Sequence, residues 1–128
     1  MQIIRYFVLA SVIALVNTVQ SFAQNAQYTC SVVHFLNSEN DKEFARINRE
    51  KEFLIVFNEG RAFVKTVCPS CDDNRTIFQL FHETDLGIYG VEVNGLGMRT
   101  ISVNTMRGEA TMSFHTPYKV TVWELACQ

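Results

Sequence analysis

A Cys-x-x-Cys pair is the element of this chain whose type and spacing most clearly point to chemistry. Thiol oxidoreductases place such a pair at a helix start, where the helix dipole lowers the pKa of the attacking thiol. Here Cys68 and Cys71 follow an expected β-hairpin, and Asp72 and Asp73 come directly after them. Because neighbouring carboxylates raise a thiol pKa, the spacing favours a structural disulfide. Redox catalysis by Cys68 and Cys71 is the alternative.

Three histidines and several acids are the remaining candidate ligands or catalysts. His34, His82 and His115 fall on separate expected strands, so nothing in their spacing predicts a shared metal. A zinc site of four cysteines would need a second close pair. The run Asp72-Asp73-Asn74 lacks the acid-glycine pattern of a calcium loop and is expected to be a solvated turn. No nucleophile motif stands out, so no catalytic, metal or cofactor residue is assigned.

The first residues of the chain have the pattern of an export signal. Arg5 precedes an apolar run over residues 6–16, and the small residues Ser21 and Ala23 follow a short polar patch. This order is typical of a cleavable signal peptide, which we place at residues 1–23. The apolar run is about a dozen residues, whereas a membrane span needs about 20. A retained anchor is the alternative, and cleavage after Ala26 is the second choice of site.

The remaining residues, 24–128, are expected to form one exported domain with disulfides. An even number of cysteines in an exported chain is typical of disulfide pairing. We favour the pairs Cys30–Cys127 and Cys68–Cys71, because the close pair can form within a turn and leaves the other two only each other. The crossed pairing of Cys30 with Cys68 and Cys71 with Cys127 stays open.

The charge of residues 24–128 argues against two classes of partner. Residues 1–23 carry one arginine and no acid, which leaves ten Lys and Arg against thirteen Asp and Glu, a net charge of about −3. Without a basic surplus, we expect no nucleic-acid binding. We also expect no stable membrane insertion once the signal is removed. The expected location is secreted or periplasmic.

The elements that would position these residues are mostly short strands. Apolar or alternating segments are separated by turn residues, which is typical of antiparallel strands joined by hairpins. Asn58-Glu59-Gly60 is expected to be a three-residue hairpin loop whose Gly60 has a positive φ. The first strand of that hairpin reads as buried on both faces. The expected strands are 27–36, 52–57, 61–67, 76–82, 88–93, 98–104, 109–115 and 119–127.

One segment differs from this pattern. Residues 37–52 contain nine charged residues in sixteen. A capping box over residues 38–41 and a stripe of Phe44, Ile47 and Lys51 favour a short surface helix, with Arg46 and Glu50 as an i,i+4 ion pair. A charged hairpin or open loop is the alternative. The fold class is therefore mostly β, a single antiparallel barrel or sandwich of about eight strands with one short helix or charged loop near 38–51.

The two ends of the predicted domain carry one resemblance to a known family. Tyr28-Thr29-Cys30 near its start and Cys127 near its end resemble the opening and closing of bacterial periplasmic lysozyme inhibitors of the small β-barrel type. The resemblance covers a handful of residues. The Ser-Gly segment that such inhibitors insert into the lysozyme cleft has no counterpart here. The resemblance implies a small barrel and an inhibitor-like function, and no binding residue is carried over.

Together these features predict a small exported binding domain without enzymatic activity. Its ligand is expected to be another protein or a small apolar molecule. The alternatives are an extracytoplasmic enzyme that uses the thiols of Cys68 and Cys71, and a structural envelope-associated protein.

Overall fold

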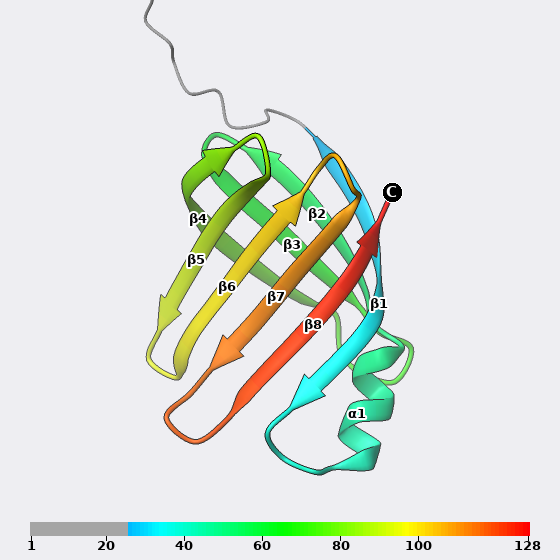
Figure 1. Ribbon diagram of the computed structural model, residues 1–128. Coiled ribbons are helices and arrows are strands. Elements are labelled where there is room, and N and C mark those ends of the chain that lie inside the picture. Colours follow the sequence, from blue (N-terminus) through cyan, green and yellow to red (C-terminus); the bar gives the residue numbers. More distant parts are fainter. Residues whose placement is uncertain (1–25) are drawn as a thin grey trace, which may run out of the picture.

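The computed structural model describes residues 26–128, which form eight strands and one helix (Figure 1). The predicted signal peptide, residues 1–23, lies outside the described residues. In chain order the elements are β1 (Gln27–Asn37), α1 (Lys42–Arg49), β2 (Glu52–Asn58), β3 (Arg61–Val67), β4 (Asn74–Thr84), β5 (Gly87–Asn94), β6 (Gly97–Asn104), β7 (Glu109–His115) and β8 (Val120–Cys127).

The strands form a closed antiparallel barrel in which each strand pairs with its neighbours in sequence. β1 also pairs with β8, in a register that runs from Cys30 opposite Cys127 to Asn37 opposite Thr121. This seam closes the sheet on itself, so that none of the eight strands within residues 26–128 is an edge strand. The predicted fold class is confirmed, and of its two forms the barrel is the one adopted.

The barrel interior is filled by side chains. Alternate residues along each strand point inward, and the largest fully buried side chains among them include Ile55, Phe57, Phe78 and Val103. An eight-stranded barrel is just wide enough for side chains to fill. The prediction that β2 is buried on both faces is wrong, because its outward residues Leu54 and Val56 keep partial exposure.

Two strands contain irregularities that change which residues face inward. The register of β1 against β8 shifts between Val32 and His34, and that of β4 against β5 shifts between Leu80 and His82. An extra residue in one strand turns the following side chains to the other face. Phe35 is thereby brought to the inner side with Val32, although strict alternation predicts opposite faces.

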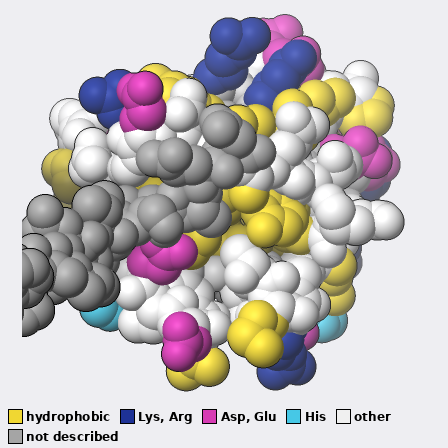
Figure 2. Space-filling view, turned by 90° about the horizontal axis from the view of Figure 1, so that it is seen from above, with side chains coloured by type: hydrophobic (Ala, Val, Ile, Leu, Met, Phe, Trp, Pro, Cys, Tyr) yellow, Lys and Arg dark blue, Asp and Glu magenta, His cyan; other side chains and the backbone are white. Residues whose placement is uncertain are grey.

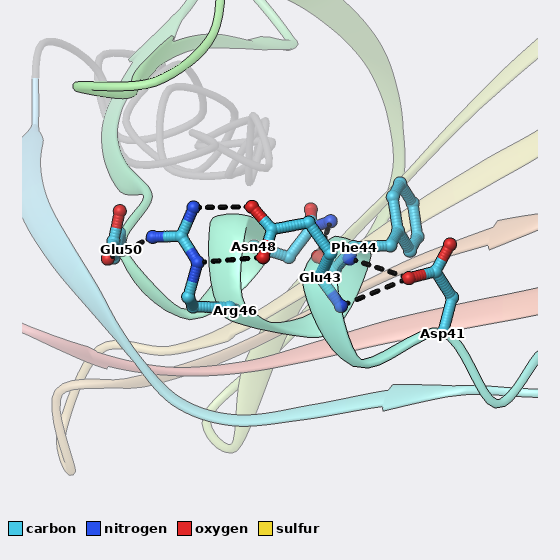
Figure 3. Close-up of polar contacts among 6 residues, drawn as sticks. All are labelled: Asp41, Glu43, Phe44, Arg46, Asn48 and Glu50. Atoms are coloured by element: carbon cyan, nitrogen blue, oxygen red, sulfur yellow. Dashed lines mark hydrogen bonds and ion pairs between the residues drawn. The ribbon is translucent and has the colours of Figure 1, made fainter.

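The charged segment after β1 forms α1, as predicted, but the helix starts later than expected. Asp41 is the N-cap, and its side chain accepts hydrogen bonds of 3.0 Å from the backbone N–H groups of Glu43 and Phe44 (Figure 3). Ser38, the first residue of the predicted capping box, instead accepts a hydrogen bond from the backbone N–H of Val120. Asp and Ser are comparable caps, so the sequence alone did not separate them.

Charged pairs on the exposed side of α1 match the sequence-based expectation. Arg46 donates to Glu50 at 2.9 Å, which is the predicted i,i+4 pair, and it also donates to Glu43 at 2.6 Å (Figure 3). Both contacts lie in solvent, where water and salt screen the attraction between the charges. These pairs favour the helix without fixing its position on the barrel.

The β2–β3 hairpin has a shorter loop than predicted. Asn58 pairs with Arg61, which leaves the two residues Glu59 and Gly60 as the loop. Their φ angles are 50° and 74°. Positive φ at both central positions is the geometry that matches the twist of a two-residue hairpin. The prediction of a three-residue loop is therefore wrong, whereas the positive φ at Gly60 is confirmed.

The two ends of the barrel differ. The end beside α1 is reached by the β3–β4, β5–β6 and β7–β8 connections, and the opposite end holds the C-terminus (Figure 1). Viewed from that opposite end, hydrophobic side chains are visible near the middle and most charged side chains lie toward the outline (Figure 2).

Candidate functional site

A pocket opens at the barrel end beside α1. It has a volume of about 210 Å³ and is lined by inward residues of the strands and by one side of the helix. Five of its lining side chains are aromatic, and three are cationic. We call it the α1-end pocket; the aromatic residues are Phe44, Phe53, Phe78, Phe114 and Trp123, and the cationic residues are Lys51, Arg99 and Lys119.

The spacing of residues along α1 explains which side chains it contributes. Phe44 and Asn48 stand at positions i and i+4 of α1, so they fall on one side of the helix, and Lys51 lies two residues beyond the helix end at Arg49. Phe44 contacts Phe35 of β1 in an edge-on arrangement, with ring centroids 5.8 Å apart. The predicted stripe contained Phe44, Ile47 and Lys51, and it missed Asn48.

Asn48 joins the helix to the barrel wall. It is 1% exposed, although it is polar. Its Nδ2 donates to the carbonyl oxygen of Phe44 at 2.8 Å, and its Oδ1 accepts from Nε1 of Trp123 at 3.2 Å. Buried polar groups are stable only when such partners are present. Asn48 therefore holds the indole ring of Trp123, the only tryptophan of the chain, in a defined position at the pocket wall.

Each of the three cations lies near the face of an aromatic ring. Nζ of Lys51 is 5.7 Å from the Trp123 ring centroid, and Nζ of Lys119 is 5.6 Å from that of Phe44. The guanidinium carbon of Arg99 lies 4.6 Å from the ring centroid of Phe114. Within about 6 Å, the negative face of a ring attracts a cation. The aromatic walls thus hold positive charge around the pocket.

One of these cations already has a close anionic partner. Arg99 donates to Glu92 at 2.9 Å, and Asn94 also donates to that carboxylate at 3.1 Å. Burial acts to raise the pKa of Glu92, but the hydrogen bonds from Arg99 and Asn94 and the charge of Arg99 outweigh it and lower the pKa. Arg99 and Glu92 therefore form a neutral pair inside the barrel wall.

The positive charges of the two lysines, Lys51 and Lys119, are less fully balanced by nearby carboxylates. Lys119 lies 3.9 Å from a carboxylate oxygen of Glu39, at the outer limit of an ion pair. Among residues 26–128, no carboxylate lies within ion-pair distance of Lys51. Burial lowers the pKa of Lys51. The pocket consequently combines aromatic and uncharged polar side chains with a surplus of positive charge, which is suited to an anionic ligand with an apolar part.

The sulfurs of the four cysteines lie at bonding distance in the two favoured pairs. Cys30–Cys127 joins β1 to β8 across the barrel seam, and Cys68–Cys71 lies within the β3–β4 loop. Cys68 is 7% exposed, and its loop leads into a strand, not a helix. The low-pKa thiol of an oxidoreductase commonly occupies a helix start. The local structure at Cys68 therefore resembles a structural turn.

The structure does not gather the candidate metal ligands. Within the described residues, no group of three or more His, Cys, Asp or Glu side chains is placed to hold a metal ion. His34, His82 and His115 lie on β1, β4 and β7, and Nε2 of His115 is hydrogen-bonded to Oγ of Ser113 at 2.9 Å. Nor does any helix within 26–128 have the length and hydropathy to cross a membrane.

The outer wall carries a second surface of interest, an apolar row across β2, β3 and β4. Val56, Phe63 and Ile77 are aligned by strand pairing, and a groove of about 380 Å³ runs over them. The neighbouring row contains the basic residues Lys65 and Arg75, which also border the groove. Exposed apolar rows of this kind commonly mark a surface that contacts another molecule.

Comparison with known proteins adds no assignment. No protein-family model matches the chain, and no curated protein or solved structure matches it. The small barrel implied by the resemblance to lysozyme inhibitors is the fold observed, while the inhibitor-like function implied by it stays a prediction. The α1-end pocket and the outer row are therefore the two structural features that bear on function.

Proposed function

We propose that this protein is an exported binding domain without enzymatic activity, and that its ligand occupies the α1-end pocket. The observation that carries the proposal is the contrast between a filled barrel interior and a pocket of about 210 Å³ at one end. Ligand sites in β-barrels are preferentially found at the barrel mouth, where apolar walls and a few polar groups converge. The α1-end pocket has both features.

The export part of the proposal is supported by the cysteines and by the leader sequence. Both cysteine pairs lie at disulfide distance, and such pairs persist mainly in oxidising compartments outside the cytoplasm. The pattern of residues 1–23 agrees with delivery to such a compartment, either the periplasm or the medium. Proteomic identification of a mature N-terminus at Gln24 in that fraction would test it.

Binding is tested by thermal unfolding of the mature protein against a panel of small acids, amines and neutral compounds. A ligand at about ten times its Kd stabilises a folded protein by about 1.4 kcal/mol. For a domain of this size that raises the Tm by about 6–11 °C. If no compound shifts the Tm and native mass spectrometry finds no co-purified ligand, the proposed function fails.

A filled-pocket variant makes that test specific. Thr66 is a pocket-lining residue with partial exposure, so Thr66→Phe should occupy the space that a ligand needs. We expect this variant to lose the ligand-induced shift in Tm. Thr29→Phe, at an exposed position on β1, is the matched control and should keep the shift.

A protein partner is the second candidate, and the outer row of Val56, Phe63 and Ile77 favours it. The flanking Lys65 and Arg75 would complement a partner whose apolar surface is bordered by acids. Phe63→Glu should then abolish co-purification of such a partner while leaving the α1-end pocket unchanged. An inhibitor-like role would belong to this candidate, with a hydrolase as the partner.

The two other predicted alternatives have separate tests. An enzyme acting through Cys68 and Cys71 should reduce insulin, and Cys71→Ser should end that activity. An envelope-associated structural protein should sediment with the cell envelope and resist salt extraction. Neither outcome is expected from a soluble binding domain.

A further inference from the structure

The charges around the α1-end pocket narrow the class of ligand. Its lining contains three cations and no aspartate or glutamate. Residues 1–25 contain no acid either, so the leader cannot supply a carboxylate to this end. Arg99 is neutralised by Glu92, as described above. Lys119 is only partly balanced by Glu39 at 3.9 Å, and Lys51 has no ion pair among residues 26–128, so these two lysines carry the surplus charge. A bound anion would complete the charge balance.

The two lysines are also held where an anion entering the pocket would meet them. Lys51 follows α1 and lies against Trp123, whereas Lys119 lies in the β7–β8 connection against Phe44. Both line the pocket, and both side chains are partly buried. In a partly desolvated position an ammonium gains more from a charged hydrogen-bond partner than it would in water.

The pocket also has an apolar part, and its volume is limited. Phe53, Phe78 and Met112 are buried core residues, and Trp123 packs beside them. An apolar cavity of about 150 Å³ holds a benzene molecule. A volume of about 210 Å³ therefore accommodates one ring, or a branched chain of similar bulk, together with a small polar group.

We propose that the α1-end pocket binds a compact apolar carboxylate, with its carboxylate between Lys51 and Lys119 and its apolar part against Trp123, Phe53 and Phe78. This inference rests on the proposed binding function and adds the charge and the size of the ligand. The carboxylate belongs either to a free small acid or to the C-terminal residue of a peptide, since both present the same chemistry.

The single tryptophan gives a direct test, because its indole lines the pocket. The probe is 3-phenylpropionate, added to the mature disulfide-bonded protein and followed by Trp fluorescence excited at 295 nm and by the indole N–H signal in NMR. The neutral 3-phenylpropionamide and the cationic 3-phenylpropylamine have the same shape and serve as charge controls. We expect the acid to bind at least about tenfold more tightly than the amide, and the amine to bind least.

Single variants test which residues supply the positive charge that binds the acid. Lys51→Met and Lys119→Met should each weaken binding of the acid about tenfold while leaving binding of the amide unchanged. Lys51→Arg should restore much of the loss. Lys65→Met is the matched control on the outer wall and should change neither Kd. Far-UV CD and the Tm of each variant establish that the barrel is intact.

Two further comparisons distinguish a free small acid from a peptide C-terminus, and a failure of the charge inference from a failure of the proposed function. A tetrapeptide with a free C-terminal phenylalanine should bind at least as well as the acid if the natural carboxylate is a peptide end, and should not bind if it is a free small acid. Equal binding of the amide and the acid overturns the charge inference and leaves the proposed function standing. If none of the three probes perturbs Trp123, the pocket is not the ligand site and both proposals fall.

Discussion

Removal of the seam disulfide should destabilise the barrel far more than removal of the loop disulfide. Cys30 and Cys127 are 97 positions apart in the sequence, whereas Cys68 and Cys71 are 3 apart. In the chain-entropy account, a crosslink stabilises by restricting the unfolded chain, and the effect grows with the logarithm of the loop it closes. This gives about 4.7 kcal/mol for the seam and about 2 kcal/mol for the loop.

Packing adds to the difference between the two pairs. Cys30 is 1% exposed and belongs to the buried core, so Cys30→Ala also removes a buried sulfur. Because a domain of this size is stable by about 5–15 kcal/mol, the double variant Cys30→Ala/Cys127→Ala should fold only marginally. The variant Cys68→Ala/Cys71→Ala should remain clearly folded.

The assay is equilibrium unfolding in urea of the wild type and both double variants, with and without reductant. Loss of the seam crosslink should lower the midpoint strongly and raise the m-value, because an unlinked chain exposes more surface when it unfolds. In reductant, the wild type should fall to the level of the seam variant or slightly below it. Equal losses in the two double variants, or a peptide map that links Cys30 to Cys68, would refute the reasoning.

Three further predictions concern single residues. Asn48→Ala should cost about 1–3 kcal/mol, because it leaves the indole N–H of Trp123 without its buried acceptor; urea unfolding and near-UV CD would measure this. Gly97→Ala should cost about 1–3 kcal/mol, since the added Cβ would collide with the backbone of β7. Gly95→Ala meets nothing within 4 Å and is its control. Burial lowers the pKa of Lys51 in the folded protein from its ordinary value of 10.5. At pH values between the folded and the unfolded pKa, the unfolded chain therefore holds a proton on Lys51 that the folded chain has lost. Stability of the wild type relative to Lys51→Met should therefore rise with pH through that window; a flat difference would contradict this.

Much of the strand pattern could be predicted because turn chemistry is local. In the β5–β6 turn, the Asn94 side chain accepts from the backbone N–H groups of Leu96 and Gly97, and Asn104 does the same in the β6–β7 turn. Asparagine and glycine mark such turns in a sequence without knowledge of the partner strand. The choice between barrel and sandwich could not be predicted in this way, because the strands of both architectures bury one face and show the same alternation of apolar and polar residues.

The irregular positions could not be predicted from alternation alone. A bulge is a relation between two paired strands, so the side to which Phe35 points depends on how β1 meets β8. The set of residues that lines the α1-end pocket could not be predicted from the sequence either. Lys51 was expected on the helix stripe, but Arg99 and Lys119 come from β6 and the β7–β8 connection and meet it only when the barrel closes.

Closure of the barrel also determines where a fusion partner or a label could be attached to this protein. The backbone N–H groups of Thr29 and Gln128 each donate to the carbonyl of the other, so the last residue is anchored beside the first strand. This end of the barrel is remote from α1 (Figure 1). A fusion partner, a surface linker or a dye joined after Gln128 would thus leave the pocket entrance unobstructed. A short peptide joining Gln128 to the start of β1 could also circularise the domain, with new ends opened at the Glu59-Gly60 turn.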